Sequence, residues 1–157
     1  MPLREEMEST GHWLFRWRSY LPLALLALVM VVVWTGGDAH DRAWYAAWLA
    51  FCLAVAAAGQ IIRALTVAYV PAGTSGRQTD GQVAEHLNTG GMYSLVRHPL
   101  YVGNFLMWLG PALYPANVWL AVVVVLVFWL YYERIMFAEE EYLRRSYGDA
   151  YEEWARR

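Results

Sequence analysis

Stretches without charged side chains divide this chain into apolar segments joined by polar loops. Residues 19–37 and 43–62 contain no Asp, Glu, Lys or Arg. A helix of about 20 apolar residues is long enough to cross the roughly 30 Å hydrocarbon core of a bilayer. Trp34 and Trp44 flank the short loop between the two stretches, and aromatic side chains are enriched at the membrane interface. The pattern therefore predicts two transmembrane helices, over 19–37 and 43–62.

A third uncharged stretch, residues 99–132, is 34 residues long. As one helix it would measure about 51 Å at 1.5 Å per residue, too long for a single crossing. Pro111 and the Tyr-Pro-Ala-Asn segment at 114–117 interrupt it near the middle, and such residues favour turns. We therefore predict a helical hairpin near the C-terminus, formed by transmembrane helices over 99–113 and 117–135 and followed by a cytoplasmic helix over 136–157.

The distribution of arginine predicts the topology. All twelve basic residues are Arg, and eleven of them lie in the N-terminal arm, in the loop over 63–98, or near and beyond the end of the last apolar segment. Only Arg42 lies in the first short loop. Positively charged loops stay on the cytoplasmic side, so we expect both termini, the arm over 1–18 and the 63–98 loop to be cytoplasmic. The predicted fold class is an all-α, polytopic membrane bundle of about four transmembrane helices, with 1–157 as a single domain.

Composition supports this class and excludes others. The chain is 59% hydrophobic and 17% charged, whereas soluble domains usually carry about 25% charged residues. A net charge of −2 offers no basic surface for nucleic acid. The single cysteine, Cys52, cannot form an internal disulfide, and no zinc-type spacing occurs, so we predict no metal site. The oligomeric state is left open.

A group of polar residues stands where the 63–98 loop meets the third apolar stretch. Pro99 is suited to begin a helix, and the N–H groups at a helix start have no partners within the helix. Together with Arg97 they would attract an anion, and His98 can donate or accept a hydrogen bond near neutral pH. Gly103 would leave one helix face open, and Asn104 offers an amide. For an isolated Arg-His pair, the alternative is that these residues only mark the membrane interface.

Three consecutive carboxylates, Glu139, Glu140 and Glu141, follow the last apolar segment. At 100° per residue, Glu139 falls on an apolar and aromatic face of the helix. A carboxylate on such a face is costly unless a cation pairs with it, so we expect Arg97 or the ammonium of a ligand beside it. Glu141 is expected to lie outside this site. The alternative is a solvated run of charges in which Glu140 and Arg144 form an ordinary pair one turn apart.

The loop over 71–89 is polar and rich in glycine. It is either a linker or a lid that contacts a substrate, because long loops without structure of their own are often functional.

Two motifs resemble those of a known superfamily. Residues 91–103 read G-x-Y-x-x-x-R-H-P-x-Y-x-G, which resembles the motif of the isoprenylcysteine carboxyl methyltransferase and phospholipid methyltransferase superfamily. Residues 139–151 read E-E-x-x-L-x-x-x-Y-G-x-x-Y, which is similar to the end of the same superfamily's domain. Together the two motifs cover about residues 90–154.

The resemblance implies an integral membrane methyltransferase that uses S-adenosylmethionine. Carried over by position, it implies catalytic roles for Arg97, His98 and Glu139. It implies that the cofactor is bound by Tyr93, His98, Pro99, Tyr101, Gly103, Asn104, Glu139 and Glu140. Arg97 would orient either the cofactor carboxylate or an anionic acceptor.

The implied acceptor is an amphiphile in the membrane: a lipid headgroup phosphate or amine, or a prenylcysteine carboxylate. Arg77 in the polar loop slightly favours an anionic lipid headgroup. Methylation of a small thiol is the alternative activity, and a scaffold or small transporter without chemistry is the alternative from another class. A lipid acceptor predicts a lateral opening between helices, whereas a thiol predicts a closed pocket.

Overall fold

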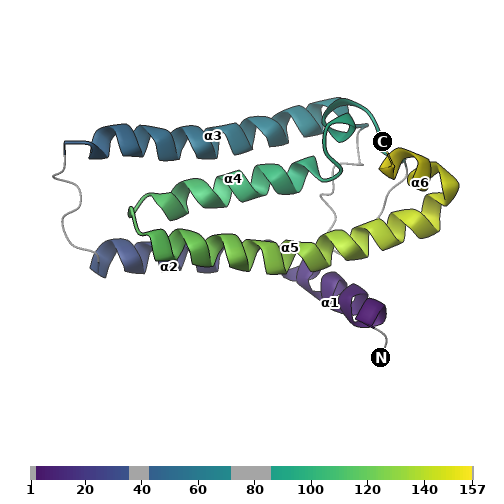
Figure 1. The fold of residues 1–157 in the computed structure, drawn as a ribbon, viewed down its shortest axis with the longest axis horizontal. Coiled ribbons are helices and arrows are strands. Elements are labelled where there is room, and N and C mark those ends of the chain that lie inside the picture. Colours follow the sequence, from purple (N-terminus) through teal and green to yellow (C-terminus); the bar gives the residue numbers. More distant parts are fainter. Residues whose placement is uncertain (1–2, 36–42, 72–85, 157) are drawn as a thin grey trace.

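The computed structural model describes residues 3–35, 43–71 and 86–156, and within these ranges every regular element is helical (Figure 1). The all-α prediction is therefore confirmed. In chain order the elements are α1 (Leu3–Trp17), α2 (Leu21–Thr35), α3 (Tyr45–Tyr69), the short 3-10 helix η2 (Gly91–Ser94), α4 (Pro99–Leu113), α5 (Val118–Tyr147) and α6 (Asp149–Ala155).

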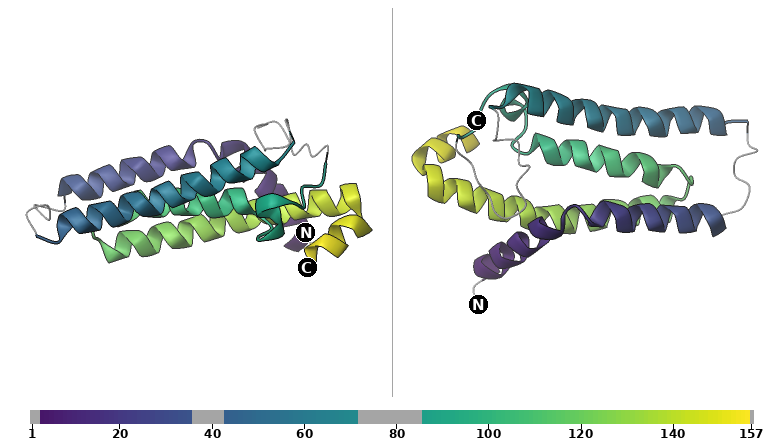
Figure 2. Two further views of the ribbon diagram at one scale, coloured as in Figure 1. Left: turned by 90° about the horizontal axis from the view of Figure 1, so that it is seen from above. Right: turned by 180° about the vertical axis from the view of Figure 1, so that it is seen from behind.

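The helices α3, α4 and α5 lie side by side along the long axis of the molecule, with α4 between the other two (Figures 1 and 2). Helix α1 packs against the second half of α5 and points away from the bundle. It meets α2 at a bend of 70° between Trp17 and Pro22. The short helix α6 follows Gly148 and turns back toward the start of α4.

Glycines allow α3 and α4 to pack closely. A Cβ atom at Gly59 would lie 2.6 Å from the carbonyl oxygen of Gly103, and one at Gly110 would lie 2.7 Å from the carbonyl oxygen of Cys52. Small residues at such positions let two backbones approach, as is common between membrane helices. This contact holds the start of α4 at a defined height along α3.

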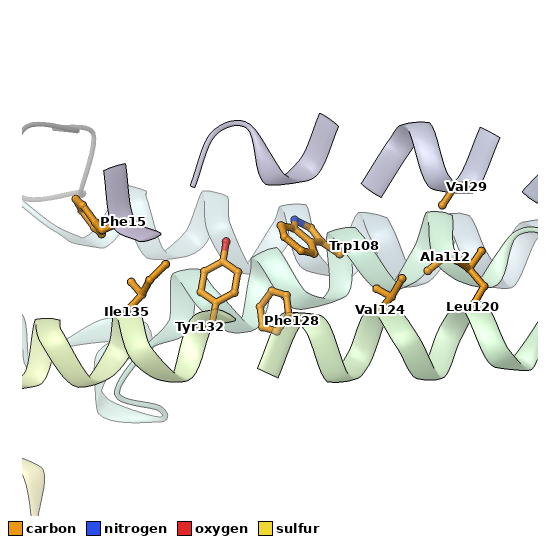
Figure 3. Close-up of a cluster of buried hydrophobic side chains, with 9 residues drawn as sticks. All are labelled: Phe15, Val29, Trp108, Ala112, Leu120, Val124, Phe128, Tyr132 and Ile135. Carbon is orange, nitrogen blue, oxygen red and sulfur yellow. The ribbon is translucent and has the colours of Figure 1, made fainter. Parts of the chain in front are cut away.

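The core lies along the face of α5 that meets α1, α2 and α4, and all four helices contribute buried apolar side chains to it (Figure 3). Trp108 meets Phe128 edge-on, with ring centroids 5.2 Å apart, and Phe128 stacks on Tyr132 at 4.1 Å. Edge-on and offset-stacked geometries are those that aromatic rings prefer. The members of the core are Phe15, Val29, Trp108, Ala112, Leu120, Val124, Phe128, Tyr132 and Ile135.

Among the described residues, α3 and α5 are long and apolar enough to cross a membrane, and the bent pair of α1 and α2 would be a third crossing if it acts as one span. The protein is thus an integral membrane protein. Helices α2 and α4 have 15 residues each, about 22 Å at 1.5 Å per residue, which is less than the hydrocarbon thickness. The four-crossing topology remains a prediction.

Several element boundaries differ from those expected. The arm over 1–18 contains a helix, α1, and α3 continues through Arg63 to Tyr69, seven residues past the expected end. Arginine is a good helix former, and Arg63 donates a hydrogen bond to Asn104 on α4, which lets the helix carry this charge. The C-terminal helix expected over 136–157 is not separate at its start. Helix α5 is continuous to Tyr147, where Gly148 with φ of +50° ends it.

Candidate functional site

The start of α4 and the end of α5 bring together residues that lie 38 to 42 positions apart in the sequence. Helix α5 returns antiparallel to α4 and has twice its length, with 30 residues against 15. It therefore passes the start of α4 before its own last turns. His98 Nε2 lies 3.0 Å from Glu140 Oε1, and His98 Nδ1 lies 3.8 Å from Glu139 Oε2. The imidazole is 14% exposed, so both carboxylates meet a largely buried ring.

Tyr101 completes this polar group one turn into α4. Its hydroxyl donates a hydrogen bond of 2.7 Å to Glu139 Oε2, and its ring stacks on the His98 ring with centroids 5.5 Å apart. Tyr93, on η2, lies near the same carboxylate. Burial, followed by the negative charge of Glu139, raises the pKa of Tyr93 to about 12. The Tyr93 phenol is therefore neutral at physiological pH and remains a hydrogen-bond donor.

Arg97 links this region to α6. One guanidinium nitrogen lies 3.9 Å from Glu140 Oε1, and another donates to the carbonyl oxygen of Ala155 at the end of α6. Carbonyl groups at a helix end attract a cation. The Arg97 side chain is 52% exposed, so it is accessible to a solute. Tyr151 of α6 is buried, and its pKa is raised to about 12 by burial and then by the charge of Glu140.

We call Arg97, His98, Tyr101, Glu139 and Glu140 the His98 cluster. It contains two carboxylates, a guanidinium, an imidazole and a phenol, all contributed by the start of α4 and the last turns of α5. Pro99 is buried at the first position of α4. The cluster presents both signs of charge within a few ångströms, which suits a ligand that carries an ammonium and a carboxylate.

Gly103 and Asn104 face α3 and the bundle interior. The prediction that Gly103 leaves one helix face open is wrong. Helix α3 fills that face, and a Cβ atom at Gly103 would lie 2.6 Å from Arg63 Cγ. Asn104 accepts a hydrogen bond from Arg63 and donates one of 3.1 Å to the hydroxyl of Tyr132. Arg63 was not among the site residues predicted from the sequence. The available signal was a lone arginine four residues after Gly59, at the end of an apolar stretch.

Glu141 is the most buried of the three consecutive carboxylates. Its side chain is 4% exposed and contacts Arg4, Arg144 at 3.1 Å and Arg145 at 3.8 Å. Helical periodicity predicts Glu139 on the apolar face, but the structure places Ala138 and Glu141 there, and Glu139 is 32% exposed. The reason is that α1 packs along this part of α5, which selects a face that rotation angles on α5 alone do not identify.

Two further expectations concern the polar loop and a metal site. Residues 72–85 of the polar loop lie outside the described ranges. Within residues 3–35, 43–71 and 86–156, no three His, Cys, Asp or Glu side chains gather closely enough to hold a metal ion.

The bundle and the His98 cluster define a helical membrane protein with a bipolar site at one end. The chain belongs to the phospholipid methyltransferase family, whose model matches residues 43–150. This confirms the superfamily that the two motifs indicated.

Three relatives show how widely the sequence is shared. The chain is 31% identical over 148 residues to the nickel-cobalt-cadmium resistance protein NccN of Alcaligenes xylosoxydans xylosoxydans, covering 94% of this chain and 63% of that protein. It is 31% identical over 121 residues to a probable protein-S-isoprenylcysteine O-methyltransferase of Oryza sativa subsp. indica, covering 73% and 59%. It is 37% identical over 71 residues to the protein-S-isoprenylcysteine O-methyltransferase of Schizosaccharomyces pombe, covering 45% and 30%.

The chain thus spans less than two thirds of the length of each of these relatives. No solved structure gives a significant match.

Proposed function

We propose that this protein transfers a methyl group from S-adenosylmethionine to an amphiphilic acceptor in the membrane. The observation that carries the proposal is the His98 cluster. Residues of both family motifs, distant in the sequence, approach to 3.0 Å between His98 Nε2 and Glu140 Oε1. Family membership supports the reaction class.

The residues of the cluster fit the cofactor's polar end, which carries one ammonium and one carboxylate. Glu139 and Glu140 suit the ammonium, since both are acceptor-only groups when ionised. Arg97 and the N–H groups at the start of α4, where Pro99 occupies the first position, suit the carboxylate. Tyr93 and Tyr101 provide neutral hydroxyl donors beside Glu139. We assign cofactor binding to these residues and to His98.

Bound S-adenosylmethionine supplies a methyl group on a positively charged sulfur, which is a strong donor and leaves as a neutral thioether. The protein's own contribution is therefore alignment and exclusion of water. His98 is 14% exposed and is held by Glu140 and by stacking on Tyr101. These contacts fix the imidazole at the site, where it orients the carboxylates. We place Arg97 where it orients either the cofactor carboxylate or the acceptor.

The acceptor that we propose is a lipid headgroup phosphate or amine, or a prenylcysteine carboxylate. The family description and the names of the plant and yeast relatives support these two acceptor classes. A location at the membrane boundary serves both reactants, because the cofactor is soluble and the acceptor resides in the bilayer. We propose four crossings with both termini in the cytoplasm, on the distribution of arginine.

The test is transfer of a labelled methyl group from S-adenosylmethionine to a total lipid extract in proteoliposomes. We expect a labelled lipid with the wild-type protein and little or none with His98→Ala or Glu139→Gln. Glu153→Gln is the matched control, because Glu153 is an exposed carboxylate on α6 outside the cluster. Label in a small added thiol instead of lipid would favour the thiol alternative.

Calorimetry separates an enzyme from a scaffold. S-adenosylmethionine titrated into the detergent-solubilised protein should release or absorb heat with saturation. The absence of any heat at millimolar cofactor would overturn the proposed function and favour a membrane scaffold or transporter.

A further inference from the structure

A cavity of about 440 Å³ lies where the bend between α1 and α2 meets α3, α4 and α5. Its lining includes two arginines, Arg18 and Arg63, together with Asn104 and Tyr132. We propose that this cavity binds the anionic group of a single-chain amphiphile, a carboxylate or a phosphate, and that Arg18 and Arg63 recognise it. The inference rests on the proposed function only in taking this amphiphile to be the methyl acceptor.

Charge favours an anion in this cavity. The lining residues include two guanidinium groups and no carboxylate. Arg63 donates a hydrogen bond to Asn104, and the guanidinium carbon of Arg18 lies 3.7 Å from the centroid of the Phe15 ring. A guanidinium has five N–H donors in a planar fork that matches a carboxylate or a phosphate. An amine at the same place would meet two like charges, which disfavours its protonated form.

The rest of the lining is apolar and suits a hydrocarbon chain. Leu25 and Leu26 of α2 and Met107 and Trp108 of α4 contribute to it. Leu26 is 53% exposed, so the cavity reaches the outer surface of α2, where a chain would continue into the bilayer. A lipid acceptor would need such a lateral path. The volume is within the roughly 300–1,000 Å³ of typical ligand pockets.

A series of side-chain hydrogen bonds and ring contacts connects the cavity to the His98 cluster. Asn104 donates a hydrogen bond of 3.1 Å to the Tyr132 hydroxyl, and the Tyr132 and Tyr101 ring centroids are 5.0 Å apart. Tyr101 in turn donates to Glu139 at 2.7 Å. The anion site and the proposed cofactor site are therefore neighbours separated by one layer of aromatic rings. Asn104, expected from the sequence to contact the cofactor, is assigned to the acceptor side as a positioning residue.

Binding of simple amphiphiles tests this assignment without the cofactor. Dodecyl phosphate, dodecanoate and dodecylamine are titrated by calorimetry into the full chain in dodecyl maltoside. Both anions should bind with saturation, and the amine should not. Arg18→Gln and Arg63→Gln should each weaken anion binding about ten- to a hundredfold, as expected for loss of a charged hydrogen bond. Tighter binding of the phosphate would indicate a lipid headgroup, and tighter binding of dodecanoate would indicate a carboxylate acceptor.

Arg16→Gln is the matched control, because Arg16 is an exposed arginine at the end of α1 that does not line the cavity. It should change anion affinity less than twofold. Equal loss in Arg16→Gln and Arg18→Gln, or binding of dodecylamine as tight as that of the anions, would overturn the inference.

A second variant covers the risk that Arg63→Gln unfolds the protein by freeing Asn104. Asn104→Asp keeps the size of the side chain and places a carboxylate in the cavity. It should abolish anion binding while circular dichroism still reports the helical fold. If Arg63→Gln does not fold, the anion affinities of Arg18→Gln and Asn104→Asp test the anion site. Unchanged anion affinity in both variants would refute the site.

The cofactor titration distinguishes failure of this inference from failure of the proposed function. Anion binding without S-adenosylmethionine binding would remove the methyltransferase function and leave the anion site. Cofactor binding without anion binding would remove only the anion site.

Discussion

Glu140 and Glu141 are adjacent in the sequence but lie in different environments. Glu140 faces the start of α4, is 29% exposed and meets a single imidazole at 3.0 Å and a more distant guanidinium at 3.9 Å. Glu141 faces α1, is 4% exposed and is surrounded by arginines from α1 and from its own helix. One residue step rotates the side chain by about 100° around a helix. That step turns Glu140 toward the start of α4 and Glu141 toward α1.

The partners of the two carboxylates explain why we assign Glu140 to ligand binding and Glu141 to stability. The partners of Glu141 are arginines that are 43–62% exposed, so the buried member of each pair is the acid. Removing it leaves cations that can turn to water. Glu139 and Glu140 instead contact side chains at a helix start, which is a place suited to anions and polar ligands.

The largest expected effect is on cofactor affinity in the His98 cluster. His98→Ala and Glu139→Gln should each weaken binding of S-adenosylmethionine by roughly ten- to a hundredfold, because a hydrogen bond to a charged group contributes about 1.5–3 kcal/mol. Calorimetry in detergent measures the affinity. Glu153→Gln should match the wild type. Wild-type affinity in both cluster variants would show that the cofactor does not bind there.

Glu141→Gln should show the opposite pattern. We expect a loss of about 1–3 kcal/mol in unfolding free energy, since a buried pair of opposite charges becomes a hydrogen bond between a guanidinium and a neutral amide. Affinity for S-adenosylmethionine should stay within twofold of the wild type. Thermal unfolding in detergent, followed by circular dichroism, reports the first quantity and calorimetry the second. A large loss of affinity with unchanged stability would reverse the assignment of the two carboxylates.

Arg4→Gln should reproduce part of that effect. Arg4 connects α1 to Glu141, but its side chain is 62% exposed. Solvent screening therefore limits the contribution of the pair to about 0.2–1 kcal/mol. Limited proteolysis of the N-terminal helix should become faster than in the wild type, while the melting curve moves only slightly. A shift as large as that of Glu141→Gln would mean that Arg4 alone holds α1 in place.

The smallest effect is expected at Arg156, which pairs with Glu152 one turn away and is 78% exposed. Arg156→Gln should change stability by less than about 0.5 kcal/mol and leave cofactor affinity unaltered. It serves as the baseline for an arginine pair without a buried partner. A measurable loss in either quantity would indicate that the end of α6 contributes more to the site than its contact with Arg97 suggests.

Local features of the sequence predicted much of the fold and part of the site. The start of α4 at Pro99 could be predicted because proline favours the first turn of a helix, and the turn before α5 because Asn117 accepts from the Leu120 N–H as an N-cap. The helical hairpin was expected, and its longer second arm carries Glu139 and Glu140 past the start of α4 to His98. Each of these inferences depends on neighbours within a few turns.

Sequence alone was thus enough to predict the helical class, the hairpin and the pair of motifs, since backbone geometry and apolar length are properties of a segment alone. It was not enough to predict that Glu141 is buried, that Gly103 packs against α3, or that Arg18 and Arg63 line one cavity. Those outcomes depend on which helix lies against which face. That choice is made by packing between distant segments such as α1 and α5, and rotation angles within one helix carry no information about it.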